Sequence, residues 1–452
     1  MKRLVFPAPL YDELVASLRL DRLVEAGAVV FVVPANSRNG EATRYLAREF
    51  WTPTEADYLL RTIDRVKLSG TFILRALVHA QQTKSGVVFV HSHPSQWNPE
   101  FSSTDDEAEH GLAQLFADRA PARDHFSVVV GIDGAASGRL LGTDRPIFIQ
   151  SVGIRIKAIS QRFASVLAEA DESRYDRQIK ALTRDGQAAI SKFRVAIIGL
   201  GGTGSHVAQQ LAYLGFSDLV LVDPDKVDVT NTNRVAGASA VDIDRPKVEV
   251  ARDMILAIRP GAHVECIKND VVNIDVLEGL RHVDAIMICT DSHGSRAVLN
   301  RLAYQFLIPA IDLGSHMAVS EAGDVQMLGR VQLLAPGLAC LHCYLNVLDA
   351  NLVRLELLHP TARARDPYGF PPHVVQPAVV SINGVVSSLA VTMLLQTLTT
   401  ISGDARSLRY DAVAGRLREA VAMSMRRCPD CARQYSALGD NAKILARSEE
   451  DI

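Results

Sequence analysis

Short apolar runs alternate with longer amphipathic segments along the first 150 residues. Three of the runs have the length of strands and are rich in valine, which predicts buried strands at Ala28–Val33, Gly86–Val90 and Phe126–Gly131. Helical patterns predict two helices, Tyr11–Leu20 and Gly70–Gln81, and acidic residues in the first turn indicate a third helix, Asp105–Ala117. This mixture predicts an α/β domain over residues 1–150.

The rest of the chain repeats a strand-then-helix order. A polar helical connector is expected over residues 151–192. A second domain is expected over residues 193–435, with five apolar runs separated by amphipathic segments: Val195–Gly199, Leu219–Asp223, His263–Ile267, Ala285–Thr290 and Ala310–Leu313. This order predicts a parallel, doubly wound, Rossmann-like sheet. Residues 351–377, which hold five prolines, are expected to form a long loop, and residues 436–452 a flexible tail.

The length, net charge and composition of the chain exclude some classes of binding partner. The 452 residues suffice for two or three domains, and the net charge of -3 offers no broad basic field, so we expect neither nucleic acid nor an acidic membrane surface as a partner. The N-terminus lacks the apolar core of a signal peptide. The most apolar stretch, Val379–Leu398, is interrupted by Asn383 and Gly384, which favours a buried helix over a membrane span.

Four of the six cysteines form two Cys-x-x-Cys pairs, Cys340/Cys343 and Cys428/Cys431. Without a secretion signal, this spacing favours a structural zinc site in a reducing compartment over disulfides, so we expect a cytoplasmic protein. The remaining two, Cys266 and Cys289, lie on predicted strands and are expected to be core residues.

A cluster of candidate zinc ligands follows the predicted strand at Gly86–Val90. His91 and His93, two residues apart, point to the same side of a strand, and Asp105 begins the next helix. Two histidines, one carboxylate and an open fourth position are typical of catalytic zinc. Ser102 is the candidate oxyanion donor and Glu25 the candidate base. The alternative is a histidine pair held by backbone hydrogen bonds.

The segment His91-Ser92-His93-Pro94, with Ser102 and Asp105, resembles the JAMM motif of JAB/MPN metalloproteases, over roughly residues 1–150. The resemblance implies a cytidine-deaminase-like α/β domain that trims or removes ubiquitin-like tags. It implies His91, His93 and Asp105 as zinc ligands, Ser102 as oxyanion donor and Glu25 as base. Residues 94–104, between His93 and Asp105, form a loop one residue longer than is usual in the family. This leaves open a first domain that only binds its substrate.

A glycine-rich turn follows the predicted strand at Val195–Gly199. Its glycines let the backbone approach phosphates at the start of a helix, and they are Gly199, Gly201, Gly202 and Gly204. Asp223, at the end of the next strand, is placed to hold ribose hydroxyls. The usual inference is a nicotinamide cofactor. However, Arg234 and Lys247 suit a triphosphate and Asp291 suits Mg²⁺, which favours nucleotidyl transfer.

These residues resemble the activating-enzyme superfamily that includes ThiF, MoeB and ubiquitin-activating enzymes, over about residues 174–435. The shared motifs are Arg174-Tyr-Asp-Arg177-Gln-Ile179, Thr230-Asn231-Thr-Asn233-Arg234, Lys247, Asp291 and the paired Cys-x-x-Cys. The resemblance implies ATP and Mg²⁺ bound by the glycine turn together with Asp223, Asp225, Asn231, Asn233, Arg234, Lys247 and Asp291. It implies that Arg177 reaches into the site of a partner subunit, and hence a homodimer. Arg174 and Asp225 are alternatively structural ion-pair residues, and Asn231 alternatively caps a turn.

The two resemblances together imply ATP-dependent adenylation of the C-terminus of a ubiquitin-like protein, with a fused zinc peptidase that trims or removes it. They imply a prokaryotic conjugation pathway or an antiviral setting. Residues 344–377 contain no cysteine for a thioester, so we expect the acyl group to pass to a conjugating enzyme or another thiol acceptor. The alternative is activation of a sulfur-carrier protein in cofactor biosynthesis, with the first domain as a binding module.

Overall fold

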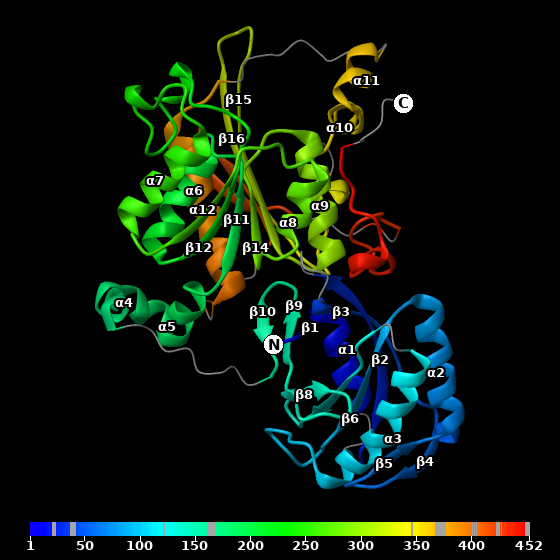
Figure 1. Ribbon diagram of the computed structural model, residues 1–452. Coiled ribbons are helices and arrows are strands. Elements are labelled where there is room, and N and C mark those ends of the chain that lie inside the picture. Colours follow the sequence, from blue (N-terminus) through cyan, green and yellow to red (C-terminus); the bar gives the residue numbers. More distant parts are fainter. Residues whose placement is uncertain are drawn as a thin grey trace. The chain divides into compact units, whose positions relative to one another are not determined.

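The computed structural model describes residues 1–19, 24–36, 42–120, 123–160, 169–344, 347–366, 377–399, 401, 403, 405–421, 425 and 427–447. The chain divides into two compact units (Figure 1). The first unit comprises residues 1–164 with 305–307 and 433–443, and the second comprises residues 165–304, 308–432 and 444–452. Each unit is built around its own mixed sheet.

The first unit contains an eight-stranded sheet of order β10-β9-β1-β3-β2-β6-β7-β8. Its strands are β1 Arg3–Pro7, β2 Gly27–Asn36, β3 Ala42–Trp51, β6 Gly86–Ser92, β7 Phe126–Val130, β8 Ala136–Leu140, β9 Phe148–Val152 and β10 Ile156–Ala158. A separate hairpin pairs β4 Tyr58–Arg61 with β5 Val66–Leu68. The helices are α1 Ala8–Leu18, α2 Gly70–Thr83 and α3 Ser103–Arg119. The strands and helices predicted over residues 1–150 are therefore present.

Both faces of this sheet are buried. On one face, Val30 and Val32 of β2 pack in a core with Leu14 of α1. On the other face, Phe31 of β2 packs with Leu77 of α2. Alternate residues of a strand point to opposite faces, so an apolar run with no polar alternation is what a strand covered on both sides requires. The sheet is thus the middle layer of a three-layer α/β unit.

The second unit contains an eight-stranded sheet of order β13-β12-β11-β14-β15-β16-β17-β18. Its strands are β11 Arg194–Ile198, β12 Asp218–Val222, β13 His263–Ile267, β14 Ala285–Ile288, β15 Ala310–Val319, β16 Val325–Leu334, β17 Ser407–Asp411 and β18 Arg416–Glu419. The first five in spatial order are parallel, and β16 to β18 continue the sheet antiparallel. The predicted Rossmann-like parallel sheet is confirmed.

Helices cover both faces of this sheet. In Figure 1, α6 Gly202–Leu214, α7 Lys247–Ile258 and α12 Val380–Leu398 lie on one face, and α8 Ile274–Leu280 and α9 His293–Phe306 lie on the other. The remaining helices are α4 Glu169–Arg174, α5 Asp176–Ile190, α10 Ala350–Leu357 and α11 Pro360–Arg365. The chain reverses its winding direction between β11 and β14, which is where open α/β sheets bind ligands.

Helix α12 is long and apolar enough to cross a membrane by length and composition, and half of its most apolar window is buried in the unit. It packs against α6, β15 and β16. At Gly329 of β16 an added Cβ would lie 2.5 Å from the Val386 side chain, so helix and sheet approach closely there. The helix predicted over Val379–Leu398 is confirmed, and its contacts are those of a core helix.

Three predictions about connecting segments need correction. The connector expected over residues 151–192 begins as strand: β9 pairs in parallel with β1, and β10 pairs with β9, because Val152 and Ile149 enter the core of the first unit. The loop expected over residues 351–377 forms α10 and α11, with Leu355 buried, and its residues 367–376 lie outside the described part.

The predicted tail, residues 436–452, is packed over most of its described length. Within the first unit, the Asn441 side chain donates to the Thr83 carbonyl, and a Cβ on Gly439 would lie 2.5 Å from the Pro34 carbonyl oxygen. Within the second unit, Arg447 donates to Asp270 over 2.6 Å. The polar composition of the segment suggested a free end, but the Asn441 and Arg447 side chains are hydrogen-bonded to the rest of their units. Residues 448–452 lie outside the described part.

Two candidate functional sites

The first unit brings together His91, His93 and Asp105. His91 Nε2 lies 3.0 Å from Asp105 Oδ1 and 3.2 Å from His93 Nε2, and His93 Nε2 lies 3.6 Å from Asp105 Oδ2. One potential ligand atom from each residue falls within 4.8 Å of the others. Ligand atoms of a tetrahedral zinc ion, with bonds of about 2.1 Å, lie about 3.4 Å apart. The three side chains therefore have the spacing of a metal's ligand set.

The end of β6 holds the two histidines in place. Ser92, between them, is buried; its Oγ accepts the Ala26 N–H over 2.9 Å, and its own N–H donates to the Ala26 carbonyl. The N–H of His93 donates to the Val130 carbonyl of β7. The extended backbone of β6 therefore continues to His93, and both imidazole rings project from the same side of the strand.

Glu25 lies beside this cluster, as predicted. Its backbone is held by the β4–β5 hairpin: the Glu25 N–H donates to the Thr62 carbonyl, and Arg61 Nε donates to the Glu25 carbonyl over 3.0 Å. Its Oε1 lies 3.6 Å from His93 Nε2, and the residue is 4% exposed. Burial raises the pKa of Glu25 to about 7, against the opposing effect of His91. A carboxyl group in this state exchanges a proton near neutral pH, as a general base must.

The protonation states in the cluster suit metal binding. Burial lowers the pKa of His93, which favours the neutral ring that a metal requires. Burial alone would raise the pKa of Asp105, but its hydrogen bond to His91, the charge of His91 and hydrogen bonds from Ser102 hold it well below its usual value. Two imidazoles, one carboxylate and an adjacent carboxyl base match the donor set of hydrolytic zinc sites. The residues present therefore fit zinc.

Ser102 is the N-cap of α3 and forms a capping box with Asp105. The Asp105 Oδ2 accepts the Ser102 N–H over 2.7 Å and the Ser102 hydroxyl over 2.8 Å. This local motif explains the Ser-x-x-Asp spacing, because N3 of a helix faces its N-cap. It also places the hydroxyl next to the cluster of His91, His93 and Asp105, although here the hydroxyl donates to Asp105.

In the second unit, the glycine turn is built by close backbone approaches. Gly199 has a φ of +88°, and a Cβ on Gly204 would lie 1.8 Å from the Gly199 carbonyl oxygen. Gly201 is the N-cap of α6, and a Cβ on Gly202 would lie 2.3 Å from Asn383 Nδ2. A side chain at Gly199, Gly202 or Gly204 would strain the turn or displace its neighbours, whereas a Cβ on Gly201 would meet nothing within 4 Å. The first amides of α6 follow directly, and a helix N-terminus attracts phosphate.

Asp223 lies at the carboxyl end of β12, next to this turn. Its Oδ2 accepts the Leu200 N–H over 2.6 Å, and its Oδ1 accepts the Asp225 N–H over 2.8 Å. Burial raises the pKa of Asp223, opposed by Lys247 and by these two hydrogen bonds. The carboxylate is therefore fixed against the glycine turn, the position expected of a ribose-binding acid.

The other residues that were predicted to bind the nucleotide come after β12 or β14 in the chain. Lys247 Nζ pairs with Asp225 over 2.8 Å, and the Asn231 side chain caps a turn by accepting the Asp228 N–H, so the structural alternatives weighed for Asp225 and Asn231 are observed contacts. Arg234 donates to Asn233 Oδ1 over 3.3 Å and packs near Gly202.

Asp291 and the two arginines of the Arg174–Ile179 motif differ in their exposure and in their hydrogen-bond partners. Asp291 is exposed just after β14, and a Cβ on Gly199 would lie 3.0 Å from the Cys289 carbonyl oxygen, so Asp291 follows the strand that flanks the glycine turn. Arg174 donates to the Ile258 carbonyl over 2.6 Å, which is a structural contact, whereas Arg177 is exposed on α5.

Asn383 was not among the predicted site residues. It is 3% exposed in α12, accepts the Ser315 hydroxyl over 2.8 Å, and presents Nδ2 to Gly202 of the glycine turn. The signal in the sequence was the polar interruption of an apolar helix, because a buried amide needs partners. Its partner could not be identified without the fold.

The four paired cysteines converge in the second unit. Cys340 Sγ lies 3.3 Å from Cys428 Sγ, and Cys343 Sγ lies 3.5 Å from Cys431 Sγ; all four sulfurs lie within 4.8 Å of one another. Four cysteine sulfurs at this spacing are consistent with a tetrahedral structural zinc site.

Buried Asn300 bridges the two Cys-x-x-Cys turns. Its Oδ1 accepts the Leu341 N–H over 3.0 Å, and its Nδ2 donates to Asp430 over 2.6 Å. We expect Asn300→Ala to remove the acceptor of the Leu341 N–H and one of the donors to the buried Asp430 carboxylate. This loss should destabilise the unit by about 3 kcal/mol. Zinc release to a chromogenic chelator should accelerate and the Tm should fall. Asn351→Ala, at an exposed position of α10, is the matched control. Release kinetics equal to those of the control would contradict the prediction.

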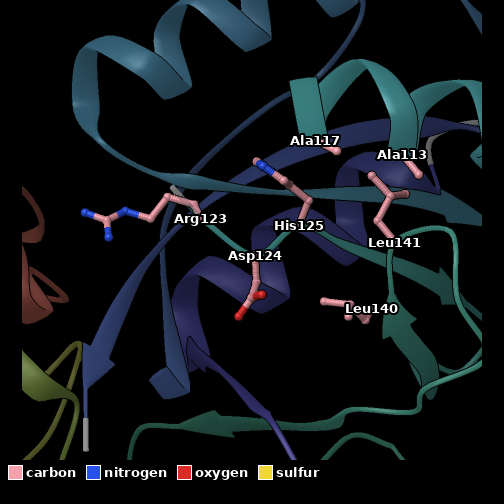
Figure 2. Close-up of a pocket in the computed structure, with 7 residues that line it drawn as sticks. All are labelled: Ala113, Ala117, Arg123, Asp124, His125, Leu140 and Leu141. Carbon is pink, nitrogen blue, oxygen red and sulfur yellow. The ribbon is translucent and has the colours of Figure 1, made fainter. Parts of the chain in front are cut away.

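The first unit also contains a pocket of about 230 Å³ (Figure 2), lined by Ala113, Ala117, Arg123, Asp124, His125, Leu140 and Leu141. Its polar side chains already make structural bonds. His125 Nδ1 accepts the Val87 N–H, Arg123 donates to the Lys84 carbonyl, and Asp124 pairs with Lys2. We therefore place the candidate chemistry at the cluster of His91, His93 and Asp105 and at the glycine turn, rather than in this pocket.

Comparison with known families matches residues 175–432 to the ThiF family. The match covers more than half of the chain, so the protein belongs to the ThiF family. Residues 1–174 lie outside the matched segment.

Two curated relatives align along nearly their whole length. The Escherichia coli molybdopterin-synthase adenylyltransferase is 27% identical over 270 residues, covering 59% of this chain and 97% of the relative. The E. coli sulfur carrier protein ThiS adenylyltransferase is 27% identical over 267 residues, covering 58% of this chain and 96% of the relative. Among solved structures, the microcin C7 biosynthetic enzyme MccB with N-formylated MccA has a TM-score of 0.47 at 19% identity, over 59% of this chain and 77% of that chain. A similarity this low indicates nothing about the substrate of the present chain.

Proposed function

We propose that this protein adenylates the C-terminus of a ubiquitin-like protein and carries a zinc peptidase of JAMM type that trims or removes the same modifier. The observation that carries the proposal is the pairing, in one chain, of a ThiF-family nucleotide site with the cluster of His91, His93, Asp105 and Glu25. Both sites would act on one chemical group, the modifier's C-terminal tail.

In the adenylation step, a carboxylate oxygen of the modifier bonds to the α-phosphorus of ATP, and the bond to pyrophosphate breaks. The amides that begin α6 and the side chains of Arg234 and Lys247 are proposed to bind the phosphates, with Asp223 on the ribose. Because Lys247 pairs with Asp225 in this structure, nucleotide binding would exchange that partner or share it. Asp291 would hold the Mg²⁺ that neutralises the developing charge.

In the peptidase step, His91, His93 and Asp105 would hold zinc, which when bound acts as a Lewis acid toward a carbonyl group and a water molecule. Glu25, beside His93 and with a pKa of about 7, would take the proton of the attacking water and deliver it to the leaving amine. Ser102 would turn its hydroxyl from Asp105 toward the developing oxyanion.

Transfer of the acyl group is proposed to go directly to the thiol of another protein. No cysteine lies between residues 344 and 377, and burial raises the pKa of both Cys266 and Cys289, which disfavours their thiolates. The exposed Arg177 is proposed to enter the site of a second copy in a cytoplasmic homodimer.

The test incubates the full chain with ATP, Mg²⁺, zinc and a ubiquitin-like protein that carries extra residues after its C-terminal glycine. Intact mass spectrometry should show loss of the extra residues and then gain of AMP. A processed modifier without AMP would refute the adenylation role, and AMP without processing would refute the peptidase role.

The relatives favour a second candidate, activation of a sulfur-carrier protein, because two of them are adenylyltransferases of molybdopterin synthase and of ThiS. In that case the first unit would only bind the carrier. Adding a sulfide donor distinguishes the two: thiocarboxylate formation on the modifier supports sulfur transfer, whereas transfer to a protein thiol supports conjugation.

A further inference from the structure

The loop between the two histidines and Asp105 folds back onto His93 through Gln96. Gln96 lies on an exposed segment, but its Oε1 is 3.1 Å from His93 Nδ1, and its N–H donates to the His93 carbonyl. The Gln96 carbonyl in turn accepts the Ile132 N–H over 2.8 Å. Gly131 allows this approach, because a Cβ there would lie 2.6 Å from the Gln96 carbonyl oxygen. The position of Gln96 is therefore set by the backbone.

The hydrogen bonds of Gln96 determine which nitrogen of His93 carries the proton. Oε1 also accepts the Glu100 N–H over 3.2 Å. A backbone N–H is always a donor, so the atom that it contacts must be the amide oxygen. That oxygen only accepts, so His93 Nδ1 must donate to it. The lone pair of His93 is then on Nε2, the nitrogen that faces His91 and Asp105.

We propose that Gln96 is a positioning residue of the metal site, which holds His93 in the tautomer and ring orientation that bind zinc through Nε2. The inference rests on the proposed zinc site and adds a residue to it. Ligating histidines commonly donate their second N–H to an oxygen acceptor, and loss of that acceptor lowers metal affinity by about 10–100-fold. The loop that is one residue longer than usual thus supplies an orienting contact rather than disrupting the site.

The experiment measures zinc affinity of the full chain by competition with a chelator, with His91→Ala used to identify the zinc bound in the first unit. Gln96→Leu should weaken that zinc by about 10–100-fold. Gln96→Glu should retain it, because a carboxylate accepts from both His93 and Glu100. Gln114→Leu, on α3, is the matched control. The Tm of the metal-free chain should be the same for Gln96→Leu and Gln96→Glu, which separates orientation from folding.

Two results would overturn the inference, and they differ in what else they overturn. Suppose that the His91→Ala variant binds one zinc fewer than the wild type, but Gln96→Leu binds zinc as tightly as the Gln114→Leu control. Then Gln96 does not position the ligand, and the metal site stands. If His91→Ala leaves zinc content unchanged, the proposed metal site fails, and the inference fails with it.

Discussion

Asp291→Asn is expected to reduce ATP–pyrophosphate exchange by about 10²–10³-fold while leaving peptide cleavage unchanged. The residue is exposed just after β14, and β14 pairs with β11, which leads into the glycine turn. A carboxylate there lies at the reversal point of the sheet, and it would hold the magnesium ion that neutralises phosphate charge. Asparagine keeps the shape and removes the charge, so the loss reports on charge stabilisation.

The exchange assay follows labelled pyrophosphate into ATP in the presence of the modifier. Asp275→Asn is the matched control, since it removes an exposed carboxylate from α8 in the same unit. Equal loss of peptide cleavage and exchange would mean that one site serves both reactions, and unchanged exchange would remove Asp291 from the nucleotide site.

The glycine turn illustrates what a sequence predicts well. Gly199 is needed because its φ is positive, and Gly204 is needed because a Cβ there would lie 1.8 Å from a carbonyl oxygen. At both positions the residue type alone indicates the local backbone geometry. The same holds for Ser102 and Asp105, whose three-residue spacing is a capping box within one helical turn. Motifs of this kind depend on neighbours in the chain.

Contacts between distant segments could not be predicted in this way. The last two residues of β9 were placed in a helical connector because the partner strand, β1, is about 145 residues earlier, and only parallel pairing shows that Val152 is buried. Asn383 reaches Gly202 from an element far along the chain. For Gln96, the residue was visible in the loop, but its role depends on the orientation of one amide relative to His93.

Glu25→Gln is expected to reduce peptide cleavage by about 10²–10⁴-fold while zinc content and ATP–pyrophosphate exchange remain those of the wild type. Glu25 is held beside His93 by two backbone hydrogen bonds, so the amide should occupy the same place. Burial gives Glu25 a pKa of about 7, which suits a group that takes and returns a proton. Glutamine cannot take that proton.

Zinc content decides whether Glu25 acts as base or as ligand. Its Oε1 is as far from His93 Nε2 as Asp105 Oδ2 is, 3.6 Å in both cases, so distance alone does not separate the roles. If Glu25 were a ligand, Glu25→Gln would lower zinc content as His91→Ala does. Glu107→Gln, exposed on α3, controls for loss of one negative charge. Loss of cleavage with zinc retained assigns the base role to Glu25. Together with the opposite pattern for Asp291→Asn, it would show that two independent sites act on the modifier's tail.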